Sequence, residues 1–271
     1  MKKLTILFIL TAFLFAGCAK TVETSAELST PDEATVDQAT PDQTEKPTEK
    51  PTEPPTLDEL AQARYDEILA SKASGHAHLE HVEAIPQYPD MEAACEAMAL
   101  TAAINRFGYD LGKEDIVDKY MVYADDCVTG YCGDPRTFYD GAGIYPPGLV
   151  TTTWNFINDR HAALYPFDTT GLGMDDLYKF LDAGCPVLIW TSVERQEPYF
   201  DGGTEYNGIF YPWFPTEHCV CLYGYDKSDG QVLVADSWYG TDEWEDASWF
   251  TELYNEIGKF SMILMDTSDL K

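Results

Sequence analysis

Four residues, spread over more than half of the chain, have the side chains that an acyl-transfer site requires: Gln87, Cys95, His218 and Asp236. A cysteine thiolate attacks a carbonyl carbon, a histidine takes up and returns the proton, and a carboxylate orients the histidine. A side-chain amide can donate a hydrogen bond to the oxyanion that forms. Together these residue types predict catalysis through a thioester, with Cys95 as the nucleophile.

Cys95 is predicted to lie in or near the first turn of a helix. Pro89 and Asp90 form a turn, and an Ala-rich segment with helical spacing follows and ends at Gly108. Backbone N–H groups at a helix start favour a thiolate, so we expect Cys95 to have the lowest thiol pKa of the seven cysteines. Gln87 lies before the turn, from where its amide can fold back beside the thiol. The alternative is a buried, unreactive cysteine in the core.

His218 and Asp236 are predicted to lie on the two strands of a hairpin. Residues 217–226 alternate between two faces, and Cys219 points away from His218, which argues against Cys219 as its partner. A turn at 227–230 leads to a strand that ends at Asp236. The register places His218 opposite Asp236 or diagonal to it, on the same face in either case. We expect Asp236 to bind one ring nitrogen while the other faces the nucleophile; the alternative is a satisfied core histidine.

Residues 1–18 predict a targeting segment. Two lysines precede an apolar stretch that is too short for a comfortable membrane span, and Phe15-Ala16-Gly17-Cys18 follows. This segment resembles a bacterial lipoprotein signal, which implies that Cys18 carries a lipid and becomes the first residue of the mature protein. The alternative is an ordinary secretory signal that ends in a cysteine.

Residues 19–56 contain no aromatic residue and are dominated by Thr, Glu, Asp and Pro, with a direct repeat of Lys-Pro-Thr-Glu over 46–53. Such a segment cannot bury enough apolar surface to offset its ordering entropy, so we expect a disordered stalk. The whole chain has a formal net charge of −30. This charge argues against nucleic acid and anionic membrane surfaces as partners, because both would repel it.

The rest of the chain predicts a linking helix at 57–75 and one domain at 76–271. Expected helices lie near 114–120, 149–158, 174–183 and 247–257, in addition to the one that begins near Cys95, and expected strands lie at 186–193, 218–225, 231–236 and 259–265. A helix-rich half thus precedes a strand-rich half, which is typical of the α+β class. Two aromatic loops, at 133–148 and 194–216, are candidates for substrate recognition.

Two further groups of residues have a chemical and a structural interpretation. Cys127 and Cys132 predict either a small-loop disulfide or two free buried thiols. His76, His78 and His81 resemble a set of metal ligands, but no fourth ligand is fixed by spacing, so a polar loop is favoured. We therefore expect neither a metal nor another cofactor.

Several short motifs occur as a group: Pro86-Gln87 before Cys95-Glu96, Gly133-Asp134-Pro135 with Gly141 and Gly143, Gly184-Cys185-Pro186-Val187 with Trp190-Thr191, Glu217-His218, Gly224-Tyr225-Asp226, and Asp236. As a set, they resemble the papain-like bacteriocin-processing peptidases (cysteine peptidase family thirty-nine), in particular the free-standing, secreted branch. The resemblance implies a papain-like α+β fold, with the catalytic cysteine at a helix start and an antiparallel sheet that carries the histidine and aspartate. It implies Cys95 as nucleophile, His218 as general base, Asp236 as orienting residue and Gln87 as oxyanion donor. Ala94 departs from the pattern, since that branch has Gly there.

Taken together, these features predict a cell-surface, lipid-anchored cysteine peptidase or amidase. We expect a peptide or protein substrate, an extracytoplasmic location and a membrane contact through the N-terminal lipid. No transporter segment is attached in the sequence, so double-glycine specificity is not implied. Two alternatives stay open. One is a catalytically silent binding module of the same fold on a stalk. The other is acyl transfer to an amine, of the transglutaminase type, by the same residues.

Overall fold

An antiparallel sheet of seven strands organises the computed structural model, which describes residues 54–270. The strands are β1 (His76–His78), β2 (Leu164–Asp168), β3 (Val187–Ser192), β6 (Glu217–Asp226), β7 (Gln231–Asp236), β8 (Thr241–Asp246) and β9 (Ser261–Asp266). Six of them run in the order β2-β9-β3-β6-β7-β8, and β1 pairs with the C-terminal half of β6. The strands β3 and β6 are buried along nearly their whole length, as expected for strands covered on both faces.

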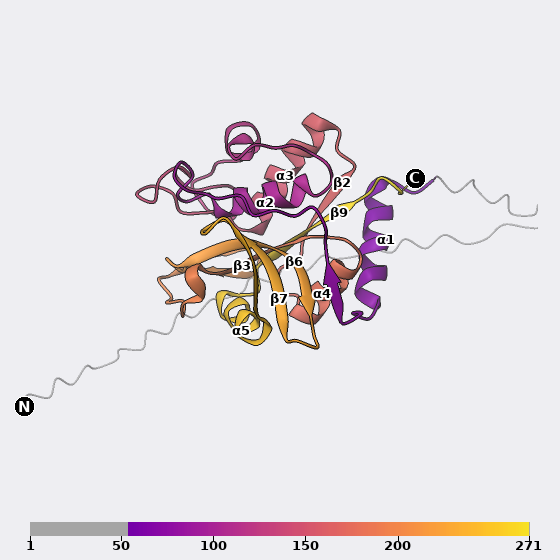
Figure 1. Ribbon diagram of the computed structural model, residues 1–271. Coiled ribbons are helices and arrows are strands. Elements are labelled where there is room, and N and C mark those ends of the chain that lie inside the picture. Colours follow the sequence, from indigo (N-terminus) through magenta and orange to yellow (C-terminus); the bar gives the residue numbers. More distant parts are fainter. Residues whose placement is uncertain (1–53, 271) are drawn as a thin grey trace, which may run out of the picture. The chain divides into compact units, whose positions relative to one another are not determined.

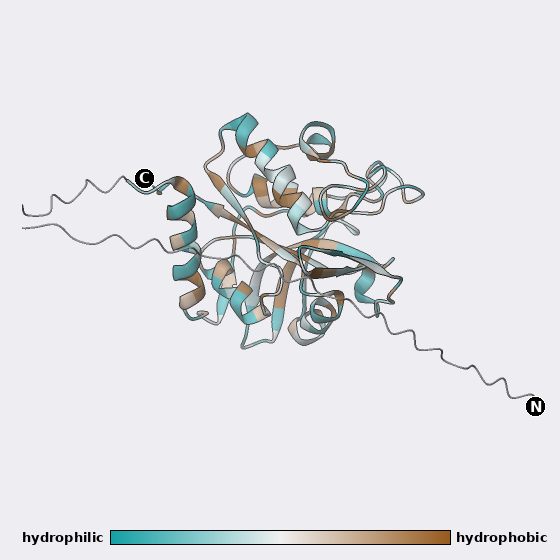
Figure 2. Cartoon of the chain, turned by 180° about the vertical axis from the view of Figure 1, so that it is seen from behind, coloured by the Kyte–Doolittle hydropathy of each residue, from teal (hydrophilic) through white to brown (hydrophobic). Residues whose placement is uncertain are grey.

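Helices provide that cover. They are α1 (Leu57–Ala70), α2 (Cys95–Asn105), α3 (Pro146–Arg160), α4 (Met174–Asp182) and α5 (Ala247–Ile257). The helix α2 packs over β6 and β3 on one side of the sheet, whereas α4 and α5 pack on the other, and α3 lies against β2 and β9 (Figure 1). In Figure 2 strands at the centre of the sheet are coloured largely as hydrophobic, whereas hydrophilic and hydrophobic residues alternate along α1. This mixed arrangement confirms the predicted α+β class.

The helix α2 is enclosed by the rest of the fold. Every residue from Cys95 to Ile104 is buried. Four of these residues are alanines and one is a threonine, and their small side chains let the sheet and the surrounding loops approach the helix closely. The N-terminus of α2 therefore has a fixed position above β6, the strand that carries His218.

The structure contains strands that the hydrophobic pattern does not predict. The strand β8 has the sequence Thr-Asp-Glu-Trp-Glu-Asp and is mostly exposed, so it carries no apolar alternation, yet it pairs along its length with β7. The aromatic loop at 194–216 contains a hairpin of β4 (Gly203–Tyr206) and β5 (Ile209–Pro212). These elements form through backbone pairing with neighbours, which a local pattern does not record.

The first helix is shorter than the segment 57–75 and belongs to the same compact unit as the sheet. Thr56 and Glu59 form a capping box at the start of this helix. Arg64 of α1 binds Asp269 at 2.8 Å, so the helix is attached to the C-terminal end of the domain. The predicted signal, Cys18 and stalk lie outside the described residues. Within 54–270, no helix has the length and apolar character needed to cross a membrane.

Candidate active site

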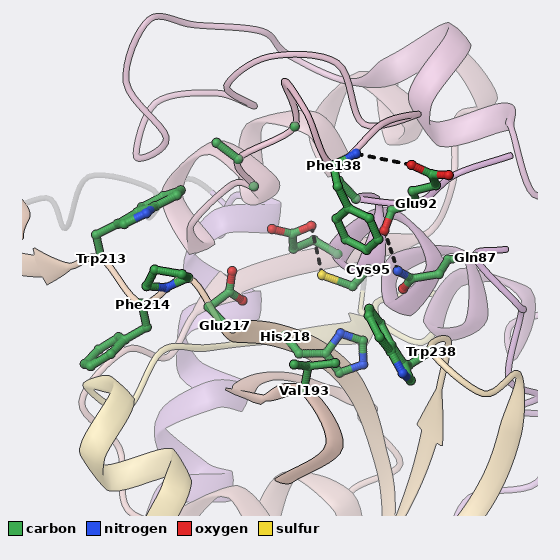
Figure 3. A pocket seen from close by; sticks show the side chains of 16 residues that line it. Gln87, Glu92, Cys95, Phe138, Val193, Trp213, Phe214, Glu217, His218 and Trp238 are labelled. Carbon is green, nitrogen blue, oxygen red and sulfur yellow. Dashed lines mark hydrogen bonds between the residues drawn. The ribbon is translucent and has the colours of Figure 1, made fainter. Parts of the chain in front are cut away.

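The four residues predicted to act together are brought together by the fold. Gln87, Cys95 and His218 line one pocket, which opens between the start of α2 and the end of the β6–β7 hairpin (Figure 3). Asp236 binds His218 and is itself almost fully buried. Cys95 is the first residue of α2, as predicted. The helix start and the hairpin thus meet at the pocket although they are separated by more than a hundred residues of sequence.

His218 and Asp236 form a buried hydrogen-bonded pair. The His218 Nε2 and Asp236 Oδ1 atoms are 2.7 Å apart. Cys221 pairs with Ala235, and this register continues to place Asp236 diagonal to His218, one of the two predicted geometries. An ionised carboxylate only accepts hydrogen bonds, so Nε2 carries the proton and Nδ1 is left to act as a base. Trp238 packs edge-on against the imidazole, with ring centroids 6.2 Å apart.

Arg195 supports this pair, a role that no motif in the sequence indicates. It follows β3 with a left-handed backbone conformation (φ 53°), and its Nη2 atom lies 3.0 Å from Asp236 Oδ2. The same guanidinium binds both carboxylate oxygens of Glu245, at 2.6 and 2.5 Å. Burial alone would raise the pKa of Asp236. The hydrogen bond from His218 and the charges of His218 and Arg195 outweigh burial and hold that pKa well below its usual range.

The Cys95 thiol does not have the environment that the helix start predicted. Its Sγ atom donates to Glu96 Oε2 at 3.3 Å, and an oxygen of Glu217 lies within 4.8 Å of both groups. Burial raises the pKa of Cys95 well above its usual value, and the carboxyl groups of Glu96 and Glu217 raise it further. The expectation that Cys95 has the lowest thiol pKa is therefore wrong, because burial, reinforced by two acidic neighbours, outweighs the helix terminus.

Glu96 and Glu217 form a pair of buried carboxyl groups beside that thiol. Glu96 Oε1 accepts a hydrogen bond from the backbone N–H of Ile144 at 2.8 Å, whereas Glu217 Oε1 is buried without a hydrogen-bond partner. Burial raises the pKa of both carboxyls, and the charge of Glu96 raises that of Glu217 further. The pair therefore retains a proton at a pH where an exposed glutamate is ionised.

We expect Glu217→Gln to stabilise the fold at neutral pH. The pKa of Glu217 is raised in the folded state, so the unfolded chain releases its proton first as the pH rises above about 4.3. The free energy of unfolding of the parent then falls with pH until the folded carboxyl also ionises. The glutamine of the variant does not ionise, so the variant does not lose free energy of unfolding in this way. The Tm of the variant should exceed that of the parent by more at pH 8 than at pH 5, and an equal difference at both values would contradict the buried carboxyl.

Gln87 is held in place from both ends of its amide. Its Oε1 atom accepts from the Ser237 hydroxyl at 2.8 Å, and its Nε2 atom donates to the carbonyl of Glu92 at 2.6 Å. The backbone N–H of Gln87 also donates to the carbonyl of Ser237. Ser237 directly follows Asp236, so the residue that fixes the amide and the residue that fixes the imidazole are adjacent. One N–H of the amide remains for a ligand in the pocket.

The remaining predicted features have mixed outcomes. Cys127 and Cys132 are free thiols in this structure, and neither is fully buried, so the disulfide alternative is not observed. Both aromatic loops contribute to the pocket, through Phe138 from the first and Trp213 and Phe214 from the second. The sequence thus predicted the loops that reach the pocket, but not which of their aromatic residues do so.

The chain is similar to solved structures of known proteins. A protein from Bacillus anthracis described as a C39-like peptidase is 24% identical to this chain, with a TM-score of 0.60, and the match covers 70% of this chain and 97% of that one. Xylellain, a cysteine protease from Xylella fastidiosa, is 13% identical with a TM-score of 0.39, covering 73% of this chain and 88% of the other. The first similarity, together with the helix and sheet arrangement, confirms the papain-like α+β fold.

Comparison of the sequence with protein-family models also places the chain among C39-like peptidases. No curated protein matches the chain. The model of the Peptidase_C39 like family matches residues 79–262, which include α2 and the β6–β7 hairpin and therefore every residue of the candidate site. Because this match spans well over half of the sequence, the chain belongs to the Peptidase_C39 like family.

Proposed function

We propose that the protein is a cysteine peptidase or amidase that cleaves an amide bond through a thioester on Cys95. The observation that carries this proposal is the buried His218–Asp236 pair in one pocket with a cysteine at a helix N-terminus. A structural histidine needs neither an ionised partner nor a nucleophile beside it. Family membership supports the same class of chemistry.

In the proposed mechanism, the Cys95 side chain turns from Glu96 towards His218 and transfers its proton to Nδ1. The sulfur attacks the carbonyl carbon of the substrate, and the oxyanion accepts hydrogen bonds from the Gln87 side chain and the Cys95 backbone N–H. The C–N bond breaks as the imidazolium returns the proton to the leaving amine. Water, deprotonated by His218, then hydrolyses the thioester and restores the thiol.

One observation favours a second candidate, a catalytically silent binding module. The Cys95 thiol is hydrogen-bonded to Glu96, and its pKa is raised, so the resting site contains a neutral thiol. A binding module does not need the thiolate, so the hydrogen bond from Cys95 to Glu96 could persist in it. An enzyme must break this hydrogen bond in each catalytic cycle. Acyl transfer to an amine in place of water uses the same residues and differs only in the second half of the reaction.

A broad activity-based probe for cysteine peptidases separates the enzyme from the silent module. We expect the purified domain to be labelled at Cys95, as located by peptide mass spectrometry, and the Cys95→Ala variant to remain unlabelled. Iodoacetamide applied after unfolding confirms that Cys95 is chemically intact. A folded domain whose Cys95 resists the probe from pH 5 to pH 9 would contradict the proposed activity.

Gln87→Ala tests the oxyanion role. The variant loses a donor to a charge that develops only after attack begins, so we expect turnover to fall on the order of 100-fold, about 3 kcal/mol, while alkylation of Cys95 is nearly unchanged. Ser237→Ala serves as a matched control, because it removes the hydroxyl that positions the amide and leaves the amide itself. It should cost less than Gln87→Ala. Parent-like turnover by Gln87→Ala would exclude this residue from the oxyanion site.

We further propose that the protein is anchored to the outer face of the cell membrane by a lipid on Cys18. The support is the sequence of residues 1–18 and the stalk-like composition that follows. Replacement of Cys18 by Ala should move the protein from the membrane fraction to the medium or leave it unprocessed, as judged by fractionation and N-terminal analysis. Membrane retention of a correctly processed variant would contradict lipid attachment.

A further inference from the structure

The carboxyl groups of Glu96 and Glu217 have no role in the thioester mechanism, yet they line the same pocket as the thiol. Figure 3 shows the Glu217 carboxylate pointing into the pocket beside Cys95. Its Oε1 atom is buried and lacks a hydrogen-bond partner. None of the residues that line the pocket, all within the described part of the chain, is a lysine or an arginine. A buried carboxylate oxygen without a donor is costly, so this wall is suited to a cationic group supplied by a ligand.

The distances restrict which cation fits. The carboxyl oxygens lie within 4.8 Å of the Cys95 sulfur. An attacked carbonyl carbon approaches its nucleophile to about 3–3.5 Å. The amino nitrogen of the same residue is two bonds from that carbon, about 2.5 Å away. It therefore reaches hydrogen-bond distance of the carboxyl pair. A lysine ammonium, at the end of a flexible four-carbon stem, would have to fold back along its own side chain to occupy the same position.

The backbone closes the pocket behind the carboxyl pair. Gly143 has φ +104°, and a Cβ atom built on it would lie 2.7 Å from Glu96 Oε1. The next residue, Ile144, donates its backbone N–H to that same oxygen. With the loop this close, little room remains on the side of Gly143 for a peptide to continue beyond an amino group bound there. The pocket extends towards Trp238 and Phe138 on one side and towards Trp213 and Phe214 on the other, where the rest of the substrate can lie.

We propose that Glu96 and Glu217 bind the α-ammonium group of the residue whose carbonyl Cys95 attacks, so that the enzyme releases single residues from free N-termini. The proposal rests on the proposed function and specifies its substrate class. The ammonium takes the place of the proton that the carboxyl pair retains, and that proton leaves to solvent. Binding also removes the hydrogen-bond acceptor of the Cys95 thiol, which frees the sulfur to turn towards His218.

Paired aminoacyl-coumarin amides, with the amino group free or acetylated, test this proposal. Several side-chain types, including alanine, leucine and lysine, are assayed in EDTA so that no metal ion competes for the three side chains. We expect kcat/KM to be at least about 100-fold higher for the free amines, whichever side chain is present. Glu217→Gln should reduce that ratio at least tenfold by slowing the free-amine substrates alone. The exposed Glu256→Gln on α5 is the charge-matched control and should keep the ratio of the parent.

A second measurement does not need turnover. Alanine amide should protect Cys95 of the parent from iodoacetamide, N-acetylalanine amide should not, and Glu217→Gln should lose the protection. Equal or faster cleavage of the acetylated substrates by the parent, with Cys95 still essential, would overturn this inference and leave the proposed function standing. An unchanged ratio in Glu217→Gln would overturn the assignment to Glu217. Absence of both probe labelling and turnover at Cys95 would refute the proposed function, and the inference with it.

Discussion

Replacing His218 with Ala is expected to lower kcat by on the order of 10⁶-fold, to below detection, while the protein stays folded. The loss is this large because His218 is the only imidazole among the described residues that line the pocket. Glu96 and Glu217 do not take over its role in the proposed mechanism, since burial raises the pKa of both carboxyls and the pair retains a proton at a pH where an exposed glutamate is ionised. Alkylation of Cys95 should also slow, since the thiolate loses its cationic partner.

The domain offers a matched control in a second histidine–aspartate pair. His76 Nδ1 and Asp226 Oδ2 are 3.2 Å apart at the other end of β6, and the His76 side chain is 62% exposed. His76→Ala should therefore leave turnover unchanged and cost no more than about 1 kcal/mol of stability. Kinetics on any cleaved substrate, with thermal unfolding in parallel, distinguish loss of the base from loss of the fold. Residual turnover of His218→Ala within tenfold of the parent would disprove its role as general base.

Asp236→Asn is expected to lower kcat by on the order of 10⁴-fold and also to destabilise the fold by about 3 kcal/mol. An asparagine can serve beside a catalytic histidine, but here Oδ1 accepts from both His218 and the Trp238 N–H while Oδ2 accepts from Arg195. Either orientation of the new amide places its NH₂ group against a donor. In one orientation the NH₂ group faces the guanidinium, and in the other it faces the imidazole and the Trp238 amide.

The pH dependence gives this prediction a second readout. The pKa of Asp236 is lowered in the folded state, so its contribution to stability is present above the unfolded pKa near 3.9 and is lost as the pH falls towards the folded value. The stability gap between parent and Asp236→Asn should therefore be widest near neutral pH and close in strong acid. Asp226→Asn, in the partly exposed pair, keeps an oxygen for the hydrogen bonds from Ser228 and Asp229 and should change stability by less than Asp236→Asn does. Parent-like kcat in Asp236→Asn would show that the imidazole is oriented by something else.

The sequence was sufficient to predict which residues lie together in the candidate site, but not the charged groups around them that shift their pKa values. A cysteine after a turn and before an Ala-rich segment, and a hairpin with His218 at one end and Asp236 at the other, are local patterns with periods of 3.6 and 2 residues. Local periodicity fixes which face each side chain occupies, so the helix start, the hairpin and the shared face of His218 and Asp236 were all predicted correctly. The family resemblance implied the α+β class, and the order of the same elements, a helix-rich half before a strand-rich half, agreed with it.

The tertiary structure decided what surrounds those residues. The low pKa expected for Cys95 rested on its helix start and its proposed histidine partner. In the fold, burial raises that pKa, Glu217 reaches the thiol from a strand more than a hundred positions away, and Glu96 turns back towards it. Arg195 approaches Asp236 from the loop after β3, and β8, which carries Glu245, has no apolar pattern. Electrostatic effects depend on distance through space and on burial, and neither is encoded in the spacing of residues along one element. For this reason the sequence indicates the catalytic residue types, whereas only the fold shows that the carboxyl groups of Glu96 and Glu217 lie beside the thiol.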